Sequence, residues 1–232
     1  MVPCLESEVH TLYRNEWPWF SDISVRSRLH IPTRARTGFS PNFFDYDNDG
    51  DFDLFISCGR VGLRKSGAPP AAGASFADRY GEPQVLLEND GSGRFAAAST
   101  ASPYFEVSHV GRGSAVGDLN NDGRVDLVVS HAGARSTVLI NQTEGGNWLG
   151  LRLQGAARTR DAIGAHVVVR AGGEAQHRWV RGGGGYLSVN DRRLHFGLGE
   201  ATRAEQIEIT WPSGKKRVLN DLAAGKWHDV AE

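Results

Sequence analysis

Cysteine, net charge and long apolar runs are all scarce in this chain. Its 232 residues include two cysteines, Cys4 and Cys58, which are too few for a disulfide framework, and the sequence leaves open whether they pair. The formal net charge is −1, so no overall charge favours nucleic acid as a partner. No segment approaches the run of about 20 apolar residues that a spanning helix needs, which argues against membrane insertion.

Motifs for zinc binding or nucleophilic catalysis are also missing. The chain has no His-Glu-x-x-His, Cys-x-x-Cys or Gly-x-Ser-x-Gly, so no catalytic residue is predicted. His109 and His131 flank the second of two acidic loops described below, where a role near a metal is conceivable. Residues 1–8 lack the basic start and apolar core of a secretory signal. The chain is therefore expected to stay in the cytoplasm or to be a piece of something longer.

Two acidic loops are the strongest signal in the sequence. The first, Asp45 to Asp53, holds five carboxylates within nine residues, which repel one another unless a cation lies among them. The second, Asp118 to Asp126, repeats the acids at positions 1, 5 and 9, with Asp or Asn at position 3 and Gly at position 6. Alternating oxygen ligands suit Ca²⁺. A plain turn explains one copy, but two copies at one spacing favour calcium.

An EF-hand is excluded because its position 12 needs Glu, whereas these loops have Ile56 and Val129 there, within β-branched runs. Each loop is predicted to join two strands and to bind calcium through the side chains at positions 1, 3, 5 and 9 and the carbonyl at position 7. The predicted ligands of the two calcium sites are Asp45, Asp47, Asp49, Asp51, Asp53, Asp118, Asn120, Asp122, Arg124 and Asp126, with Asp51 and Arg124 acting through their backbone carbonyls.

A second repeat accompanies the loops. Residues 11–15, 85–89 and 137–141 each end a short strand on Asn, and a turn and an aromatic residue follow. The predicted unit is strand, calcium loop, strand and outer hairpin, which is typical of a β-propeller blade. Since there are three hairpins and two loops, residues 1–144 are predicted to form a partial β-propeller of about two and a half blades. Its open strand edge needs the missing blades or another copy as a partner.

The long connection from Gly59 to Pro83 is predicted to be either a binding loop or a solvated excursion, the second being favoured. Its candidate contact residues are Arg60, Arg64, Lys65, Arg79 and Tyr80.

From residue 145 onward, apolar and polar residues alternate in short runs separated by turns. This pattern predicts that residues 145–232 form a small antiparallel β-sandwich, with Trp148, Trp179 and Trp211 in its core. The run Gly182–Gly185 is expected to let backbone approach backbone, with Tyr186 packed beside it. Surface pairing of Asp161 with Arg160 and of Asp191 with Arg192 is also conceivable, without functional weight.

These motifs resemble known families. Residues 43–50 and 115–123 look like the FG-GAP/VCBS repeats of integrin α-subunit propellers. Residues 160–167, 185–188, 194–199 and 211–214 look like an ASPIC/UnbV domain, as in the cartilage acidic protein-like family. The resemblance implies a calcium-stabilised propeller followed by a β-sandwich, in a secreted, periplasmic or cell-surface protein. Family members have more blades and an export signal, so an N-terminally truncated member is expected.

Two functions follow from these patterns. The favoured one is a non-catalytic, calcium-binding extracellular interaction or adhesion module that recognises a protein or glycan. The alternative is an enzyme, or an accessory subunit of one, in which a loop calcium acts as a Lewis acid on a small molecule. Four side chains and one carbonyl per ion nearly close the coordination shell, which favours the structural role.

Overall fold

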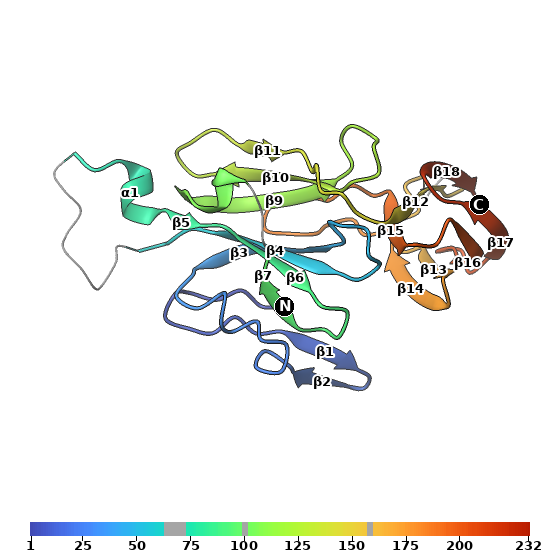
Figure 1. Cartoon of the computed structure of the whole chain (residues 1–232), viewed down its shortest axis with the longest axis horizontal. Coiled ribbons are helices and arrows are strands. Elements are labelled where there is room, and N and C mark those ends of the chain that lie inside the picture. Colours follow the sequence, from blue (N-terminus) through green and yellow to red (C-terminus); the bar gives the residue numbers. More distant parts are fainter. Residues whose placement is uncertain (63–72, 99–101, 157–159) are drawn as a thin grey trace.

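The computed structural model describes residues 1–62, 73–98, 102–156 and 160–232, and these are mainly β-strands, as predicted (Figure 1). Arg64 and Lys65, two of the candidate contact residues, lie outside the described residues. Within that part of the chain the only helices are α1 (Phe76–Tyr80) and the short 3-10 helix η1 (Pro103–Phe105). Neither has the length and apolar character to cross a membrane. Both cysteines are free.

The first unit forms the predicted four-stranded antiparallel sheet. Its strands are β3 (Gly38–Phe44), β4 (Asp53–Cys58), β6 (Val85–Asn89) and β7 (Phe95–Ala97), in the order β3-β4-β6-β7. Every residue of β4 is buried, because both faces of this strand contribute to hydrophobic clusters. The first acidic loop connects β3 to β4, as the sequence predicted.

The second unit has three strands in the described residues, so the predicted fourth strand is wrong. The strands are β9 (Gly111–Gly117), β10 (Asp126–His131) and β11 (Thr137–Leu139), in the order β11-β10-β9. The second acidic loop joins β9 to β10. Trp148, the aromatic residue that follows the turn after residues 137–141, lies in β12 (Asn147–Gln154), which pairs with strands of the C-terminal region.

The remaining N-terminal strands form two small pairs. β1 (Tyr13–Glu16) pairs with β2 (Trp19–Asp22), and β5 (Glu82–Pro83) pairs with β8 (Ser108–His109). Arg60, a candidate contact residue of the long connection, turns inward. Its guanidinium pairs with the buried carboxylate of Glu82 at 3.4 Å.

Two sheets in the C-terminal region share one hydrophobic core. One has the order β15-β12-β18 and the other β14-β13-β16-β17. Their further strands are β13 (His166–Ala171), β14 (Glu174–Trp179), β15 (Leu194–Gly199), β16 (Arg203–Thr210), β17 (Lys216–Ala223) and β18 (Lys226–Ala231). The expectation of purely antiparallel pairing is wrong, because β18 pairs parallel to β12. The chain reaches β18 from β17, which belongs to the other sheet. No hairpin joins β12 to β18, so their pairing need not be antiparallel.

The three tryptophans assigned to this core occupy different environments. Trp211 is 2% exposed and belongs to the core, as predicted. Trp179 is 47% exposed, so its core assignment is wrong; it lies opposite His166 in the sheet register, and the two rings stack at 4.3 Å. Trp148 is half-buried and lies over Gly123 of the second acidic loop. The tryptophan pattern therefore marks one core residue, one surface residue and one contact between regions.

Replacing Leu151 of β12 with alanine tests the shared core. The Leu151 side chain is fully buried between the sheets, so Leu151→Ala should lower the free energy of unfolding by about 2–5 kcal/mol. The matched control is Leu187→Ala, since Leu187 is 89% exposed and its truncation should change stability by less than about 0.5 kcal/mol. Denaturant unfolding measures both values, and equal losses would contradict this core.

Candidate metal sites

Three carboxylates converge in the first acidic loop. One oxygen from each of Asp45, Asp47 and Asp49 lies within 4.8 Å of the other two. Asp45 is 2% exposed, and its Oδ2 accepts a hydrogen bond from the Gly50 N–H at 3.0 Å. Its Oδ1 is buried and has no hydrogen-bond partner among the described residues. A buried anionic oxygen without a partner is costly, so this arrangement suits a bound cation.

The environment of the loop opposes ionisation of its acids. Burial, reinforced by Asp49 and Asp47, raises the pKa of Asp45 to about 7. Burial and the Asp49 charge also raise the pKa of Asp51 to about 6. A divalent cation would reverse both effects, because it favours the charged carboxylates.

Asp53, the predicted ligand at position 9, closes the loop through hydrogen bonds. Its Oδ2 accepts the Tyr46 N–H at 3.1 Å and its Oδ1 accepts the Asn89 N–H at 2.9 Å. Burial raises the pKa of Asp53 to about 8. Asp53 thus lies outside the convergent cluster, and it joins the loop to the end of β6.

Asp51 points inward more than the sequence suggested. Its predicted contribution is the backbone carbonyl alone, yet its carboxylate oxygen Oδ1 is buried and has no hydrogen-bond partner in the described part of the chain. Strict alternation does place position 7 on the same side as positions 1, 3, 5 and 9, but the prediction assigned only the backbone carbonyl of Asp51 to the ion.

The second loop has the same backbone plan but different electrostatics. Asp126 repeats the closing hydrogen bonds of Asp53, accepting the Leu119 N–H at 2.8 Å and the Asn141 N–H at 2.8 Å. Both oxygens of Asp118 accept hydrogen bonds, Oδ1 from the Asp122 N–H and Oδ2 from the Gly123 N–H and the Trp227 indole N–H. The acid at position 1 is therefore satisfied here by the protein itself.

Arg124 supplies a positive charge to this second loop. Its guanidinium pairs with Asp122 and donates to the Asn141 carbonyl at 2.9 Å, whereas the sequence-based prediction used only its backbone carbonyl. The Asn120 side chain also donates to Asp122, at 2.8 Å. Among the described residues, the second loop contains no convergent cluster of three acidic ligands. Three predicted ligands of the first loop therefore converge, whereas those of the second loop do not form such a cluster.

His109 and His131 lie far from either loop along their strands. His131 is opposite Gly111 at the start of β9, whereas the acidic loop follows Gly117 at the other end of that strand. The two imidazoles stack at 4.7 Å, and burial lowers the pKa of His131 to about 4. A role for these histidines near the second-loop metal is therefore excluded by geometry.

Both loops contact the C-terminal region, a feature that their spacing did not reveal. In the first loop, the Asp47 and Asn48 carbonyls accept hydrogen bonds from the Gly146 and Gly199 N–H groups, each at 2.9 Å. In the second loop, the Gly123 carbonyl lies 2.9 Å from His195 Nε2. We call this set of contacts between the two loops and residues 146–232 the domain seam.

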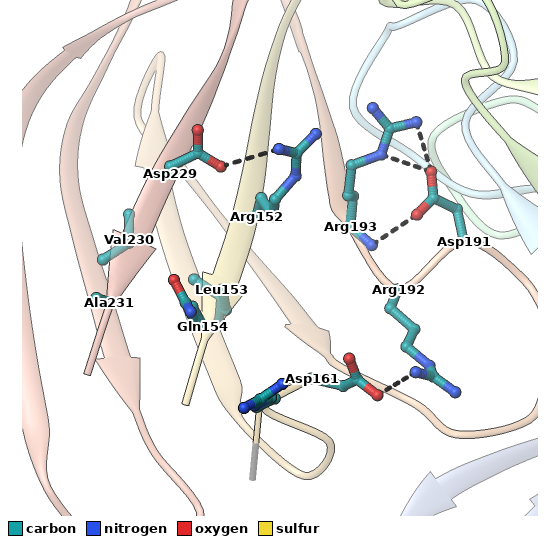
Figure 2. A pocket seen from close by; sticks show the side chains of 11 residues that line it. Arg152, Leu153, Gln154, Asp161, Asp191, Arg192, Arg193, Asp229, Val230 and Ala231 are labelled. Carbon is teal, nitrogen blue, oxygen red and sulfur yellow. Dashed lines mark hydrogen bonds and ion pairs between the residues drawn. The ribbon is translucent and has the colours of Figure 1, made fainter. Parts of the chain in front are cut away.

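A hollow of about 690 Å³ in the C-terminal region is lined by ion pairs (Figure 2). Arg152 pairs with Asp229 at 3.5 Å, Arg193 with Asp191 at 2.6 Å, and Arg192 with Asp161. The pairings considered from the sequence, Asp161 with Arg160 and Asp191 with Arg192, are not those formed. Each aspartate in the hollow already has an arginine partner, so the first acidic loop is the stronger candidate site.

The raised pKa values predict how stability depends on pH without a cation. Above about pH 6.5 the folded protein still holds protons on Asp45 and Asp53 that the unfolded chain has released, so stability should fall as the pH rises through about 7–8. His131 and His195 partly offset this decline near pH 6.5, because burial lowers their pKa values to about 4 whereas about half of each imidazole is still charged in the unfolded chain. Melting temperatures in chelator at about pH 6.5 and 8.5 measure the effect.

The control for this prediction is Asp45→Asn, which removes one of the two titrating groups and should flatten the decline. A melting temperature that rises over the same interval in the unmutated protein would contradict the prediction.

Comparison with known proteins adds family relationships to this geometry. Cartilage acidic protein 1 of Homo sapiens is 30% identical over 221 residues, which cover 92% of this chain and 30% of the human protein. The Mus musculus protein of the same name is 30% identical over 98% of this chain and 35% of its own length. The chain thus spans about a third of the length of these relatives. Residues 155–232 match the family model described as ASPIC and UnbV.

Proposed function

We propose that this chain is a non-catalytic, calcium-binding interaction module. The observation that carries the proposal is the buried Asp45 carboxylate, whose Oδ1 lacks a hydrogen-bond partner among the described residues while Asp47 and Asp49 converge on the same place. Calcium takes six to eight oxygen ligands in a flexible shell, which suits this set of donors. The bound calcium ion would offset the negative charge of the crowded carboxylates.

The first loop is the principal site in this proposal. Asp45, Asp47 and Asp49 would hold the ion together with the Asp51 carbonyl, while Asp53, the remaining ligand predicted from the sequence, would hold the loop in shape from outside the cluster. The second loop is the weaker candidate, because Arg124 already pairs with Asp122. Asp118, Asn120 and Asp126 would serve there only after that arginine is displaced.

The fold supports a propeller interpretation of residues 1–144. In both units a loop aspartate accepts the backbone N–H of an Asn, namely Asn89 at the end of β6 for Asp53 and Asn141, two residues after β11, for Asp126. We therefore interpret the units as FG-GAP/VCBS-type blades of a partial propeller. The two C-terminal sheets, which share one core, support a β-sandwich over residues 145–232.

A protein or glycan partner outside the cytoplasm fits this module. Two similar proteins carry cartilage in their names, and cartilage consists largely of extracellular matrix, which supports a secreted, periplasmic or cell-surface location. No residue is assigned to the binding of that partner, since the contacts described above are internal to the chain.

The β1–β2 hairpin is the proposed open edge. Trp17, Trp19 and Phe20 are 84%, 75% and 63% exposed, which is unusual for large apolar side chains that lie together on one hairpin. Asn15 occupies the repeat position of Asn89 and Asn141, whose amides contact a loop aspartate. We infer that the hairpin receives a further sheet of the same type, from missing blades or from another copy.

Calcium should raise the melting temperature, since a ligand that binds only the folded state stabilises it by mass action. At a free calcium concentration about 100 times Kd the expected gain is about 2.7 kcal/mol. Asp49→Ala should remove most of that gain, because it deletes one of three convergent carboxylates. Differential scanning calorimetry in chelator and in millimolar calcium measures both.

The matched control is Asp122→Ala in the second loop, which should preserve most of the gain because Arg124 occupies that acid. Identical melting curves of the unmutated protein with chelator and with calcium would overturn the proposal.

A further inference from the structure

The first acidic loop is held against the C-terminal region by backbone hydrogen bonds. The carbonyls of Asp47 and Asn48 accept the N–H groups of Gly146 and Gly199, and both donors belong to the C-terminal side of the seam. Asp47 is also one of the three convergent acids. The residues that would hold a cation and the residues that dock the C-terminal region are therefore the same short segment.

The approach at this contact is too close for side chains. A Cβ at Gly146 would lie 2.5 Å from the Asn48 carbonyl oxygen and 2.6 Å from the Gly199 Cα. A Cβ at Gly145 would lie 1.9 Å from the Asp47 carbonyl oxygen. A side chain at either glycine would therefore force the backbone to shift. The first loop and the C-terminal region can approach this closely only because both positions are glycine.

A charged side chain from the C-terminal region faces the same loop. The Arg178 guanidinium lies 3.7 Å from the ring centre of Phe52, which follows Asp51 in the loop, and its charge acts on Asp45. Gln176, two residues earlier on β14, donates to the Gly197 carbonyl at 2.6 Å. This docked positive charge beside Asp45 disfavours a cation, so the backbone hydrogen bonds of Asp47 and Asn48 are the contacts that can couple docking to cation binding.

We propose that cation binding in the first loop and docking of the C-terminal region are coupled, each strengthening the other. Ordering residues 45–49 around a cation fixes the Asp47 and Asn48 carbonyls in the orientation that Gly146 and Gly199 require. By linkage, the docked C-terminal region must raise the affinity for the cation by the same factor. This inference rests on the proposed calcium site and adds a conformational consequence to it.

Amide hydrogen exchange of the full chain, followed by NMR, tests the coupling directly. Adding calcium should slow exchange of the Gly146 and Gly199 N–H groups by about tenfold or more, a usual size for coupling between two sites. The control amide is Gly214, which donates to the Trp211 carbonyl in a turn of the C-terminal region and should not change. Unchanged exchange at Gly146 and Gly199, with calcium bound, would overturn the coupling.

A pair of glycine variants tests the reciprocal effect on calcium affinity. Gly146→Ala obstructs docking against Asn48, which is not a predicted ligand, and should weaken calcium binding about tenfold in isothermal titration calorimetry. Gly183→Ala is the control, because a Cβ there meets nothing within 4 Å, and its affinity should equal that of the unmutated protein. Equal affinities for both variants would contradict the coupling.

The two proposals fail in different ways. Absence of any calcium binding by the unmutated chain would overturn the proposed function and, with it, the coupling. Normal calcium binding with neither slowed exchange nor a difference between the glycine variants would overturn the coupling alone. The exchange measurement uses the unmutated chain, so it decides the question even where Gly146→Ala does not fold.

Discussion

Repulsion among converging carboxylates is the constraint on which the rest of this structure depends. Asp45, Asp47 and Asp49 converge in one loop, and the first of them is withdrawn almost completely from water. Charges in such surroundings interact strongly, so they need protons, a countercharge or a cation. The second loop meets the same need with the guanidinium of Arg124, which pairs with Asp122. The residue at position 7, Asp51 in the first loop and Arg124 in the second, thus gives two loops of similar spacing a different charge.

The last aspartate of each loop has a structural task that is independent of any ion. Asp53 and Asp126 each accept one backbone N–H from the start of their own loop and one from an Asn at or just after the end of the third strand. Both oxygens of each carboxylate take part in these hydrogen bonds. They join the loop to the sheet, so the loop is held in shape at its base while its tip stays close to the C-terminal region.

Glycines on both sides of the seam let the two regions approach closely. Gly123 of the second loop lies against the Trp148 indole, and Gly146 and Gly199 of the C-terminal region donate to the first loop. Arg193 lies over the Trp227 ring at 4.2 Å and donates to the Asp118 carbonyl. Both acidic loops therefore lie directly against the C-terminal region.

Local spacing determined much of this protein. Alternating aspartates, followed by apolar β-branched runs, predicted two strand-to-strand loops and the β class, because both depend on residues close together in sequence. Tertiary structure decided what the spacing could not contain. Four features depend on which strands meet and which side chains share a surface. They are the three-stranded sheet of the second unit, the parallel pairing of β18, the exposure of Trp179 and the pairing of Arg124 with Asp122. The unequal chemistry of the two loops arises there, because burial and neighbouring charge are properties of the folded chain.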